Sequence, residues 1–345
     1  MASAITSNTR VSSSFSLNFP GLFPVTSHTD YVGPNSTFVA IKGMREDGVQ
    51  YIPLALARGA RTIVIQEDVQ LEPAVLKHIE HLGATLKRVD NCRSALAQLS
   101  GAALNWPSRK LHIIAVTGTK GKTTTTFLLE HIFRKAGYKT ALLSSVKNRI
   151  IERDFSTNLT TQHPDYLQVF LDLCVQARVD WVIMEVAAQA TSLHRVEGIL
   201  FDGLVFTNFA QEHGEFYPTL EEYFNAKKAL LSQLKPYAPC VLNKDDSRVA
   251  DLASLCQRPL FFSQSLSHAF SQEKKSLERS EVHAVLEKSS LSSGLQGTLM
   301  TQDQACSFAL PVLIGNYNGA NCAAAAACGL SAYVTIVLSA GIIAL

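Results

Sequence analysis

The sequence has 345 residues, with 31 Lys and Arg against 29 Asp and Glu, so its formal charge is only +2. Apolar residues make up 47% and charged residues 17%, which excludes an intrinsically disordered chain and is ample for packed cores. No basic excess exists to track phosphates, so a protein that binds nucleic acid through bulk charge is excluded as well.

Seven cysteines are scattered along the chain, and no two of them form a CxxC pair. Their odd number and wide spacing predict free thiols in a reducing compartment, without a structural zinc. We therefore expect a cytoplasmic protein that is a monomer.

The two ends of the chain differ from its middle. Residues 1–27 are rich in Ser and Thr, but their single Arg is too few for an organelle transit peptide, so we treat them as a poorly defined segment. Residues 322–345 are all apolar or small, a length that could span a membrane. Five consecutive Ala and the absence of flanking Lys or Arg argue against that, so no membrane partner is expected.

From residue 36 onward, short β-branched runs alternate with helical stretches, and the length suggests about two domains. The first part has the βαβαβ order of a small α/β layer domain, and residues 105–108 break the pattern. We predict a domain over residues 28–107. Its predicted elements are strand 36–43, helix 49–60, strand 61–67, helix 71–82 and strand 85–90.

The second part, residues 108–329, has strands of near-continuous apolar character, which favours a parallel sheet buried on both faces. Residues 263–310 turn polar and Ser-rich, which indicates loops or antiparallel strands at an edge. The fold class is therefore α/β, with a small N-terminal α/β domain before a mostly parallel sheet. The predicted elements are strands 111–116, 140–145, 181–186, 203–208 and 240–243 and helices 122–136, 164–178 and 219–235.

The strongest motif is GTKGKTT, placed between a predicted strand and a predicted helix. Two glycines that tolerate φ > 0 let backbone N–H groups converge on phosphates, and the helix N-terminus adds partial positive charge. The Lys then reaches the terminal phosphates and the following Thr offers its hydroxyl to Mg²⁺. A glycine turn before a helix that happens to contain Lys is the alternative. The predicted nucleotide-binding residues are Gly118, Thr119, Lys120, Gly121, Lys122, Thr123 and Thr124.

Two ionisable residues fall where burial is expected. Glu185 ends a buried strand, where a carboxylate is costly unless it meets a cation such as Mg²⁺, or else water. On helix 219–235, Lys227 falls at the centre of the apolar stripe. A buried Lys is expensive, so the alternative is a Lys that snorkels to solvent.

Several segments carry a family resemblance. AVTGTKGKTTTTFLLEHIF resembles the ATP loop of the Mur ligase superfamily, and MEVAAQATSLHRV resembles its MEVSSH…HRV segment. Residues 205–231 are similar to VFTNLSxDHLDYH…EYxxAKxxLF, residues 314–327 to GxxNxxNxxAA, and residues 41–60 to the front domain. The resemblance covers most of residues 36–327 and is closest to the ligases that add the third residue of the peptidoglycan stem.

The resemblance implies an enzyme of peptidoglycan precursor synthesis. It would use ATP to activate the carboxylate of a UDP-N-acetylmuramoyl-dipeptide as an acyl phosphate, which an amino acid then attacks. It implies two Mg²⁺ ions, held by Thr123, Glu185, His213 and a carbamylated Lys227. Lys122, Lys227 and His213 would be catalytic. The substrate would contact Thr29, Thr160, Thr161 and Arg195, and Asn318 and Asn321 would lie near the adenine.

The sequence departs from the family pattern in several places. Thr29 and Asp30 replace the Ser and Arg that help to hold the UDP-sugar, Ala187-Ala188-Gln189 replaces Ser-Ser-His, and Lys120 replaces an Asn. No third, amine-selecting domain is recognisable, and residues 330–345 read as an aberrant tail from a truncation or frame change. We therefore expect the chain to bind nucleotide weakly and to ligate poorly.

Three alternatives stay open. One is a folylpolyglutamate- or cyanophycin-type ligase that shares the loop. The second is a non-catalytic remnant that binds nucleotide or UDP-sugar. The third is a membrane-anchored form held by residues 330–345.

Overall fold

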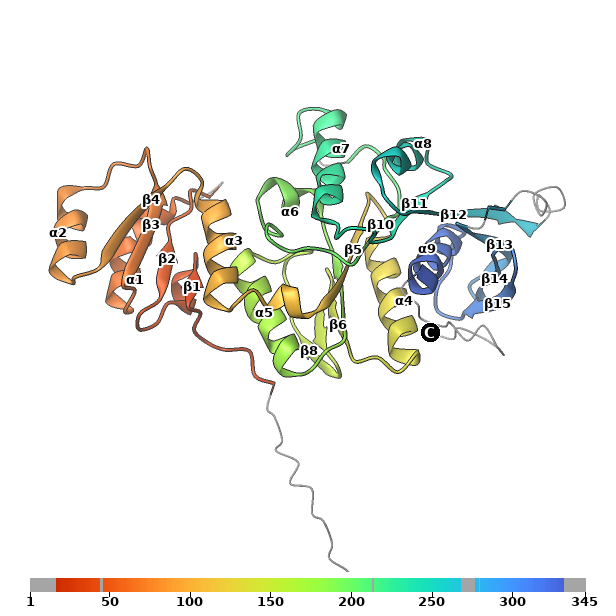
Figure 1. The fold of residues 1–345 in the computed structure, drawn as a ribbon, viewed down its shortest axis with the longest axis horizontal. Coiled ribbons are helices and arrows are strands. Elements are labelled where there is room, and N and C mark those ends of the chain that lie inside the picture. The colour runs from red at the N-terminus through yellow and green to blue at the C-terminus, as the bar shows by residue number, and fades with distance from the viewer. Residues whose placement is uncertain (1–16, 44–45, 213, 268–276, 279, 332–345) are drawn as a thin grey trace, which may run out of the picture.

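In a computed structural model of the chain, the residues described are 17–43, 46–212, 214–267, 277–278 and 280–331. They form two β-sheets, one N-terminal and one much larger, that follow each other along the long axis (Figure 1). Helices cover both faces of each sheet, so the predicted α/β class is confirmed.

The N-terminal sheet has four parallel strands in the order β1-β2-β3-β4. One face packs on α1 and α2 through Phe38 and Ile63, and the other packs on α3 through Val39 and Val64. Successive residues of a strand thus enter two different cores, which explains the continuous apolar runs. Its elements are β1 Val25–Thr26, β2 Thr37–Val39, α1 Ile52–Ala57, β3 Thr62–Gln66, α2 Pro73–His81, β4 Thr85–Val89 and α3 Cys92–Ala103.

The larger sheet has the strand order β15-β14-β13-β12-β11-β10-β5-β9-β6-β7-β8. Its strands from β6 to β13 in that order run parallel, and both edges end in antiparallel pairs. The strands are β5 His112–Thr117, β6 Thr140–Leu143, β7 Asn148–Ile150, β8 Arg153–Phe155, β9 Trp181–Glu185, β10 Gly203–Phe206, β11 Cys240–Asn243, β12 Pro259–Leu266, β13 Glu281–Ser290, β14 Gly294–Met300 and β15 Ala305–Leu310. The helices are α4 Lys122–Lys135, α5 Pro164–Gln176, α6 Ala188–Ser192, α7 Leu220–Lys228, α8 Ser247–Ala250 and α9 Tyr317–Ser331.

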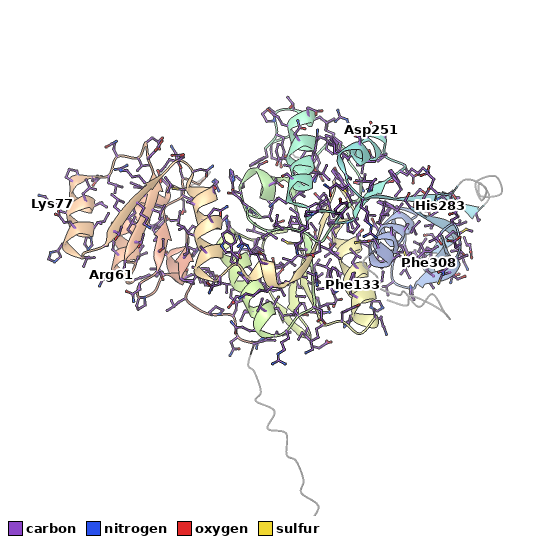
Figure 2. The ribbon with its side chains drawn as sticks, viewed as in Figure 1. Arg61, Lys77, Phe133, Asp251, His283 and Phe308 are labelled. Atoms are coloured by element: carbon purple, nitrogen blue, oxygen red, sulfur yellow. The ribbon has the colours of Figure 1, made fainter. Side chains whose placement is uncertain are left out.

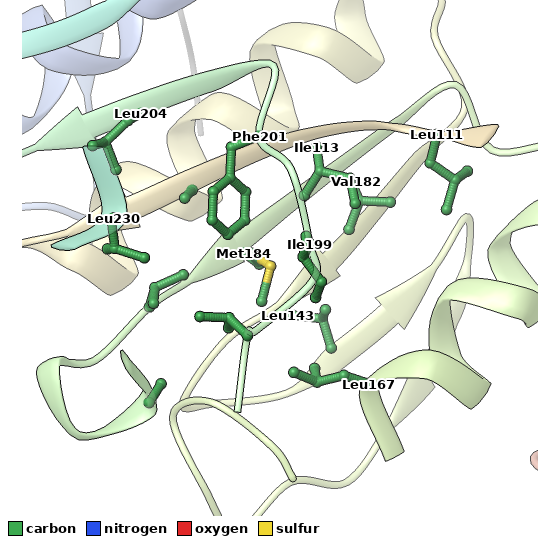
Figure 3. Packing of buried hydrophobic residues seen from close by; sticks show 14 of the residues in the cluster. Leu111, Ile113, Leu143, Leu167, Val182, Met184, Ile199, Phe201, Leu204 and Leu230 are labelled. Atoms are coloured by element: carbon green, nitrogen blue, oxygen red, sulfur yellow. The ribbon is translucent and has the colours of Figure 1, made fainter. Parts of the chain in front are cut away.

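Two hydrophobic cores sandwich this sheet. Met184, Phe201 and Leu204 belong to the core that includes α5 (Figure 3). Phe133 on α4 and Phe308 on β15 belong to the core on the opposite face, which α4 and α9 cover (Figure 2). Because β5, β9 and β10 are parallel neighbours, their carboxyl ends meet at one edge, where α4 begins.

The helices differ from the sequence-based predictions in several places, and the short helices α6 and α8 were not predicted. The helix predicted over 219–235 ends as α7 at Lys228 and continues as a 3-10 helix over Ala229–Gln233. The helix predicted over 49–60 is a 3-10 turn, Gly48–Tyr51, followed by α1. Helix α3 was not predicted, because its small residues give a weak periodic signal. The side chain of Asn91 caps α3 by accepting the backbone N–H of Arg93 and of Ser94.

The strands resolve one alternative and add β1, β7 and β8, which were not predicted. Strands β13 to β15 pair antiparallel at the edge of the sheet, as one alternative for residues 263–310 predicted, whereas the part of β12 in that range pairs parallel with β13. Strand β1, which is too short for a periodic signal, lies within the segment 1–27 and pairs with β2. The domain boundaries at 28, 107 and 329 stay predictions. Helix α9 extends through Ser331, and the rest of the segment 330–345 lies outside the described residues.

The seven cysteines are all free thiols, as predicted. Among the described residues, no helix combines the length and the apolar character needed to cross a membrane.

Candidate active site

The phosphate loop lies where β5 ends and α4 begins. Gly118 has φ 140° and Gly121 has φ 82°, so both adopt backbone conformations that favour glycine. A Cβ on Gly118 would lie 2.0 Å from Thr207 Oγ1, and one on Gly121 would lie 2.3 Å from Asn321 Oδ1. Both glycines are therefore required by conformation and by space.

The loop is tied to the chain that follows β10. The Lys120 backbone N–H donates to Asn208 Oδ1 (2.8 Å), and the Thr207 hydroxyl donates to the Lys120 carbonyl (2.6 Å). The Thr119 hydroxyl donates to the Ala210 carbonyl (3.1 Å). These bonds cross about ninety positions of sequence and hold the loop open at the sheet edge. The Lys120 ammonium, which replaces the family Asn, forms an ion pair with Glu212.

The side chain of Lys122 folds over the loop. Its ammonium donates to the carbonyls of Gly118 and Thr119, both at 2.9 Å. Burial lowers the pKa of Lys122, and the charges of Glu185 and Glu212 partly oppose that shift. Thr124, in the same first turn of α4, is half-buried. A cation held by two neutral carbonyls can exchange these bonds for phosphate oxygens at modest cost.

Thr123 and Glu185 meet as the sequence predicts. The Thr123 hydroxyl donates to Glu185 Oε2 (3.1 Å), and Glu185 is only 1% exposed. The Ser145 backbone N–H donates to Glu185 Oε1 (3.0 Å), which adds a residue that sequence reasoning missed. Burial raises the pKa of Glu185, and the bonds from Ser145 and Thr123 oppose that shift. The buried carboxylate and the hydroxyl form an oxygen donor set of the kind that Mg²⁺ prefers.

Lys227 reaches the same loop from α7. Its side chain is 1% exposed, so the snorkelling alternative is wrong. The ammonium donates to the Gly118 carbonyl (2.7 Å) and lies 4.7 Å from the centre of the Tyr223 ring. Burial, followed by the charge of Lys122, lowers the pKa of Lys227 to about 6. No carboxylate bonds to Lys227 among the described residues. His213, the remaining predicted ligand, lies outside them.

The two asparagines of α9 lie beside the loop, but their polar atoms are occupied. Asn321 donates through Nδ2 to Asn318 Oδ1 (2.9 Å), and Asn318 donates through Nδ2 to the Ile314 carbonyl (2.8 Å). The Thr125 hydroxyl approaches Asn321 Oδ1 at 3.4 Å. Asn321 therefore connects α9 to α4, Asn318 supports Asn321, and contact with adenine stays a prediction.

The predicted substrate residues fall into two places. Thr161 is buried, and its hydroxyl donates to the Glu185 carbonyl (2.9 Å) and accepts the Ala187 N–H (3.1 Å). Arg195 donates through Nη1 to the Thr161 carbonyl (2.8 Å), and Thr160 is half-buried next to it. These bonds place Thr160, Thr161 and Arg195 at the carboxyl end of β9, close to Glu185.

Thr29 lies apart from this cluster. It lines a cleft of about 750 Å³ between the N-terminal sheet and the chain before α5. We call this cleft the inter-domain cleft. Asp30, which replaces the family Arg, forms an ion pair with Arg58 at 2.7 Å. Arg93 and His163 also line the inter-domain cleft, and sequence reasoning missed both. The position of Arg93 in the first turn of a capped helix was the only available signal.

A buried parallel strand, a glycine loop and a lysine at a helix N-terminus define the class of α/β proteins with a phosphate loop. Within that class, the sequence profile described as the Mur ligase middle domain matches residues 116–329. The chain therefore belongs to the Mur ligase family, as the motifs predict.

The chain is similar to named ligases over part of their length. It is 35% identical over 213 residues to the UDP-N-acetylmuramoyl-L-alanyl-D-glutamate–2,6-diaminopimelate ligase of Caldanaerobacter subterraneus. The aligned segment covers 62% of this chain and 42% of the relative. It is 34% identical over 248 residues to the UDP-N-acetylmuramyl-tripeptide synthetase of Deinococcus radiodurans. That alignment covers 71% of this chain and 48% of the relative. The chain thus spans less than half the length of these two relatives.

Solved structures support the fold. A UDP-N-acetylmuramoyl-L-alanyl-D-glutamate–2,6-diaminopimelate ligase aligns with a TM-score of 0.71 at 20% identity, which covers 92% of this chain and 61% of that one. The MurF ligase of Thermotoga maritima in complex with ADP aligns with a TM-score of 0.61 at 19% identity, which covers 92% of this chain and 66% of that one.

Proposed function

We propose that this chain binds ATP and activates the carboxylate of a UDP-N-acetylmuramoyl-dipeptide as an acyl phosphate, the first half of an ATP-dependent ligation of a third amino acid. The observation that carries this proposal is the convergence on Gly118: Lys122 from α4 and Lys227 from α7 both donate to its carbonyl. A cation and a second amine that meet at one phosphate loop suit a reaction that moves negative charge between oxygens. The names of the relatives support the choice of substrate.

The chain's own residues divide the work. The backbone N–H groups of the loop and Lys122 bind the phosphates, as the geometry of the loop favours. Thr161 and Arg195 hold the end of β9 and the neighbouring chain in register, where the substrate carboxylate has to approach. Positioning of that carboxylate in line with the terminal phosphate is the main task, because phosphoryl transfer needs little covalent help from the protein.

Thr123 and Glu185 would hold a Mg²⁺ ion, and the residues present fit that role. Glu185 is buried without a cationic hydrogen-bond partner among the described residues, and the hydroxyl next to it is a neutral oxygen ligand. A bound Mg²⁺ would neutralise charge on the phosphate oxygens. His213 and a carbamylated Lys227 are proposed for the second ion.

Carbamylation of Lys227 would give the buried site the acidic group that it lacks. The amine is enclosed, and burial together with the charge of Lys122 lowers its pKa to about 6, so it is held in the neutral form that can become a carbamate. The carbamate would be attracted by Lys122. Carbon-13 NMR of the protein in labelled bicarbonate tests this step. We expect a carbamate signal that is absent from Lys227→Met and present in Lys228→Met.

The proposed activation step can be measured without the amino acid. Hydroxylamine traps an acyl phosphate as a hydroxamate, so the chain is incubated with ATP, Mg²⁺, hydroxylamine and UDP-N-acetylmuramoyl-dipeptide. We expect hydroxamate and ADP in equal amounts, and a loss of at least about 100-fold in Lys122→Met, because a charge-assisted contact to the transferred phosphate is removed. Lys110→Met is the control. Binding of ATP without any hydroxamate would refute the activation step and favour the non-catalytic remnant.

A further inference from the structure

Strands β12 and β13 carry a group of polar side chains at the end of the larger sheet that is opposite the N-terminal sheet (Figure 1). The two strands run parallel, and Ser263 pairs with His283 in their register. Because side chains alternate along a strand, Ser263 and Ser265 share one face of the sheet with Glu281 and His283. Phe262, the neighbour of Ser263, belongs to the core that α9 covers, so the four polar side chains lie on the opposite face.

His283 lies between two serine hydroxyls (Figure 2). Its Nδ1 is 2.7 Å from Ser263 Oγ, and its Nε2 is 2.7 Å from Ser265 Oγ. The Ser263 hydroxyl in turn donates to Glu281 Oε1 at 2.7 Å. The Lys244 ammonium forms an ion pair with Glu281 Oε2 (2.6 Å), which holds the carboxylate in place. These side chains thus form one continuous row of contacts that begins at Lys244 and ends at Ser265.

The directions of these hydrogen bonds follow from the number of hydrogens. A serine hydroxyl has one hydrogen and a carboxylate can only accept, so the hydrogen of Ser263 points to Glu281. Ser263 Oγ then accepts the Nδ1–H of His283. In a neutral imidazole, a hydrogen on Nδ1 leaves a lone pair on Nε2, which accepts the hydroxyl of Ser265. A hydroxyl that donates to an imidazole oriented by a third group is the arrangement of an activated nucleophile.

Exposure to solvent differs along this row of side chains. Glu281, Ser263 and His283 are each 5% exposed or less, whereas Ser265 is half-buried. Leu266, the residue after Ser265, is 39% exposed. The imidazole and the groups that hold it are therefore enclosed, while the hydroxyl at the end of the row borders the surface. This order suits a nucleophile, which has to meet its substrate, with a base fixed behind it.

We propose that Ser265 is a nucleophile with His283 as its general base, and that this second site takes acyl groups from carboxylic esters. Ser265 Oγ bonds to the carbonyl carbon while its proton passes to His283 Nε2, and the bond from that carbon to the alcohol oxygen breaks. The alcohol leaves with the proton from His283. Water then attacks the acyl-serine with the same base, so ester and water give alcohol and carboxylic acid. Ser263 and Glu281 are positioning residues, because they fix the imidazole and its tautomer without contacting the ester.

Covalent labelling of the 345-residue chain with a fluorophosphonate tests the nucleophile, because an activated serine attacks the phosphorus and displaces fluoride. We expect an adduct on Ser265 by peptide mass spectrometry, and none at this position in Ser265→Ala. In His283→Gln we expect labelling of Ser265 to be at least about 100-fold slower, since Gln keeps a hydrogen-bonding side chain but cannot take a proton. Ser254→Ala is the matched control, because the exposed Ser254 hydroxyl donates only to a backbone carbonyl, that of Asp251.

The role of Ser263 is tested by hydrolysis of p-nitrophenyl acetate. Ser263→Ala should lower kcat about tenfold at an unchanged KM, and Ser263→Thr should restore kcat, because the hydroxyl that fixes the tautomer returns. A structural role alone would not give this split between kcat and KM.

Two results would overturn the proposal. One is a wild-type chain without an adduct on Ser265, and the other is an equal labelling rate in wild type and in His283→Gln that thermal unfolding shows to be folded. The site uses neither ATP nor the phosphate loop, so Ser265→Ala should form ATP-dependent hydroxamate at the wild-type rate. Failure of this proposal therefore leaves the proposed ligase function intact, and failure of the ligase function leaves the labelling of Ser265 unchanged.

Discussion

The phosphate loop and the inter-domain cleft treat their polar groups in opposite ways. In the loop, Lys122, Thr119 and Lys120 all bond to protein atoms, and Asn321 of α9 leaves no space for a Cβ on Gly121. In the cleft, Arg93 and His163 keep donors that no described residue accepts. The loop therefore holds its shape by itself, whereas the cleft is completed by its ligand.

This difference predicts where each region is sensitive. The glycines of the loop have short contacts to their neighbours and leave no space for an added atom, so substitutions of these glycines act through stability. A cleft with free donors tolerates substitutions structurally, so they act on binding. Each of the following experiments probes one side of that comparison.

The largest effect is expected from Gly118→Ala. The added Cβ would lie 2.0 Å from Thr207 Oγ1 at a φ of 140°, so we expect a loss of about 3 kcal/mol in the free energy of unfolding. Gly83→Ala is the control, because Gly83 has a positive φ but open space around it and should lose about 1 kcal/mol. Urea denaturation measures both. Equal losses in the two variants would show that the loop is not packed as described.

The pH dependence of stability probes Lys227. Its pKa is lowered to about 6, against roughly 10.4 in an unfolded chain, so between these values the unfolded state binds a proton that the folded state lacks. The free energy of unfolding should therefore rise with pH over this window, by at most about 1.4 kcal/mol per pH unit from this group. Lys227→Met lacks that contribution. Urea denaturation between pH 6.5 and 9 in carbonate-free buffer should show a shallower slope for it than for wild type.

Lys228→Met, the next residue on α7, is the control for this slope. It should follow the wild-type pH profile, because Lys228 does not reach the loop carbonyl that Lys227 contacts. Parallel profiles for Lys227→Met and wild type would contradict the assignment of a buried, neutral amine.

The smallest effect is expected at Glu197, which joins α3, the helix of Arg93, to the segment that contains Arg195. Glu197 accepts the Ser94 hydroxyl (2.7 Å) and the Gln98 amide (3.0 Å) from α3, and it pairs with His194. Glu197→Ala should cost about 1 kcal/mol in thermal unfolding and also weaken the UDP compound, because α3 loses a tie to the chain that bears Arg195. Glu80→Ala, on the exposed face of α2, is the control. If Glu197→Ala binds the UDP compound as tightly as wild type, the hydrogen bonds of Glu197 do not contribute to binding at the cleft.

The parts of the site that local patterns encode were predictable. The loop is seven consecutive residues between a strand and a helix, and its glycines have the positive φ that such a turn requires. Burial of Lys227 followed from helical spacing, even though α7 is shorter than predicted. The resemblance implied that Thr123 and Glu185 share a Mg²⁺ ion, and the two side chains are hydrogen-bonded to each other.

The parts that depend on packing between distant segments were not predictable. Ser145 joins Glu185 only because β6 lies beside β9. The hydroxyl of Thr161 is occupied by the backbone around Glu185 and Ala187, which no spacing rule reveals. No motif marks Arg93 in the sequence, and only the position of α3 in the fold places it at the cleft.

The amino-acid sequence by itself determined the α/β class, the phosphate loop and the membership of the Mur ligase family, because periodicity and contiguous motifs are local properties of the chain. The tertiary structure alone decided that Asn321 of α9 meets Thr125 of α4 and that residues of α3 and of the chain before α5 line one cleft. Those features depend on contacts between distant segments, such as Thr125 with Asn321 at a separation of 196 positions, whose energies exist only once the sheets and helices have packed.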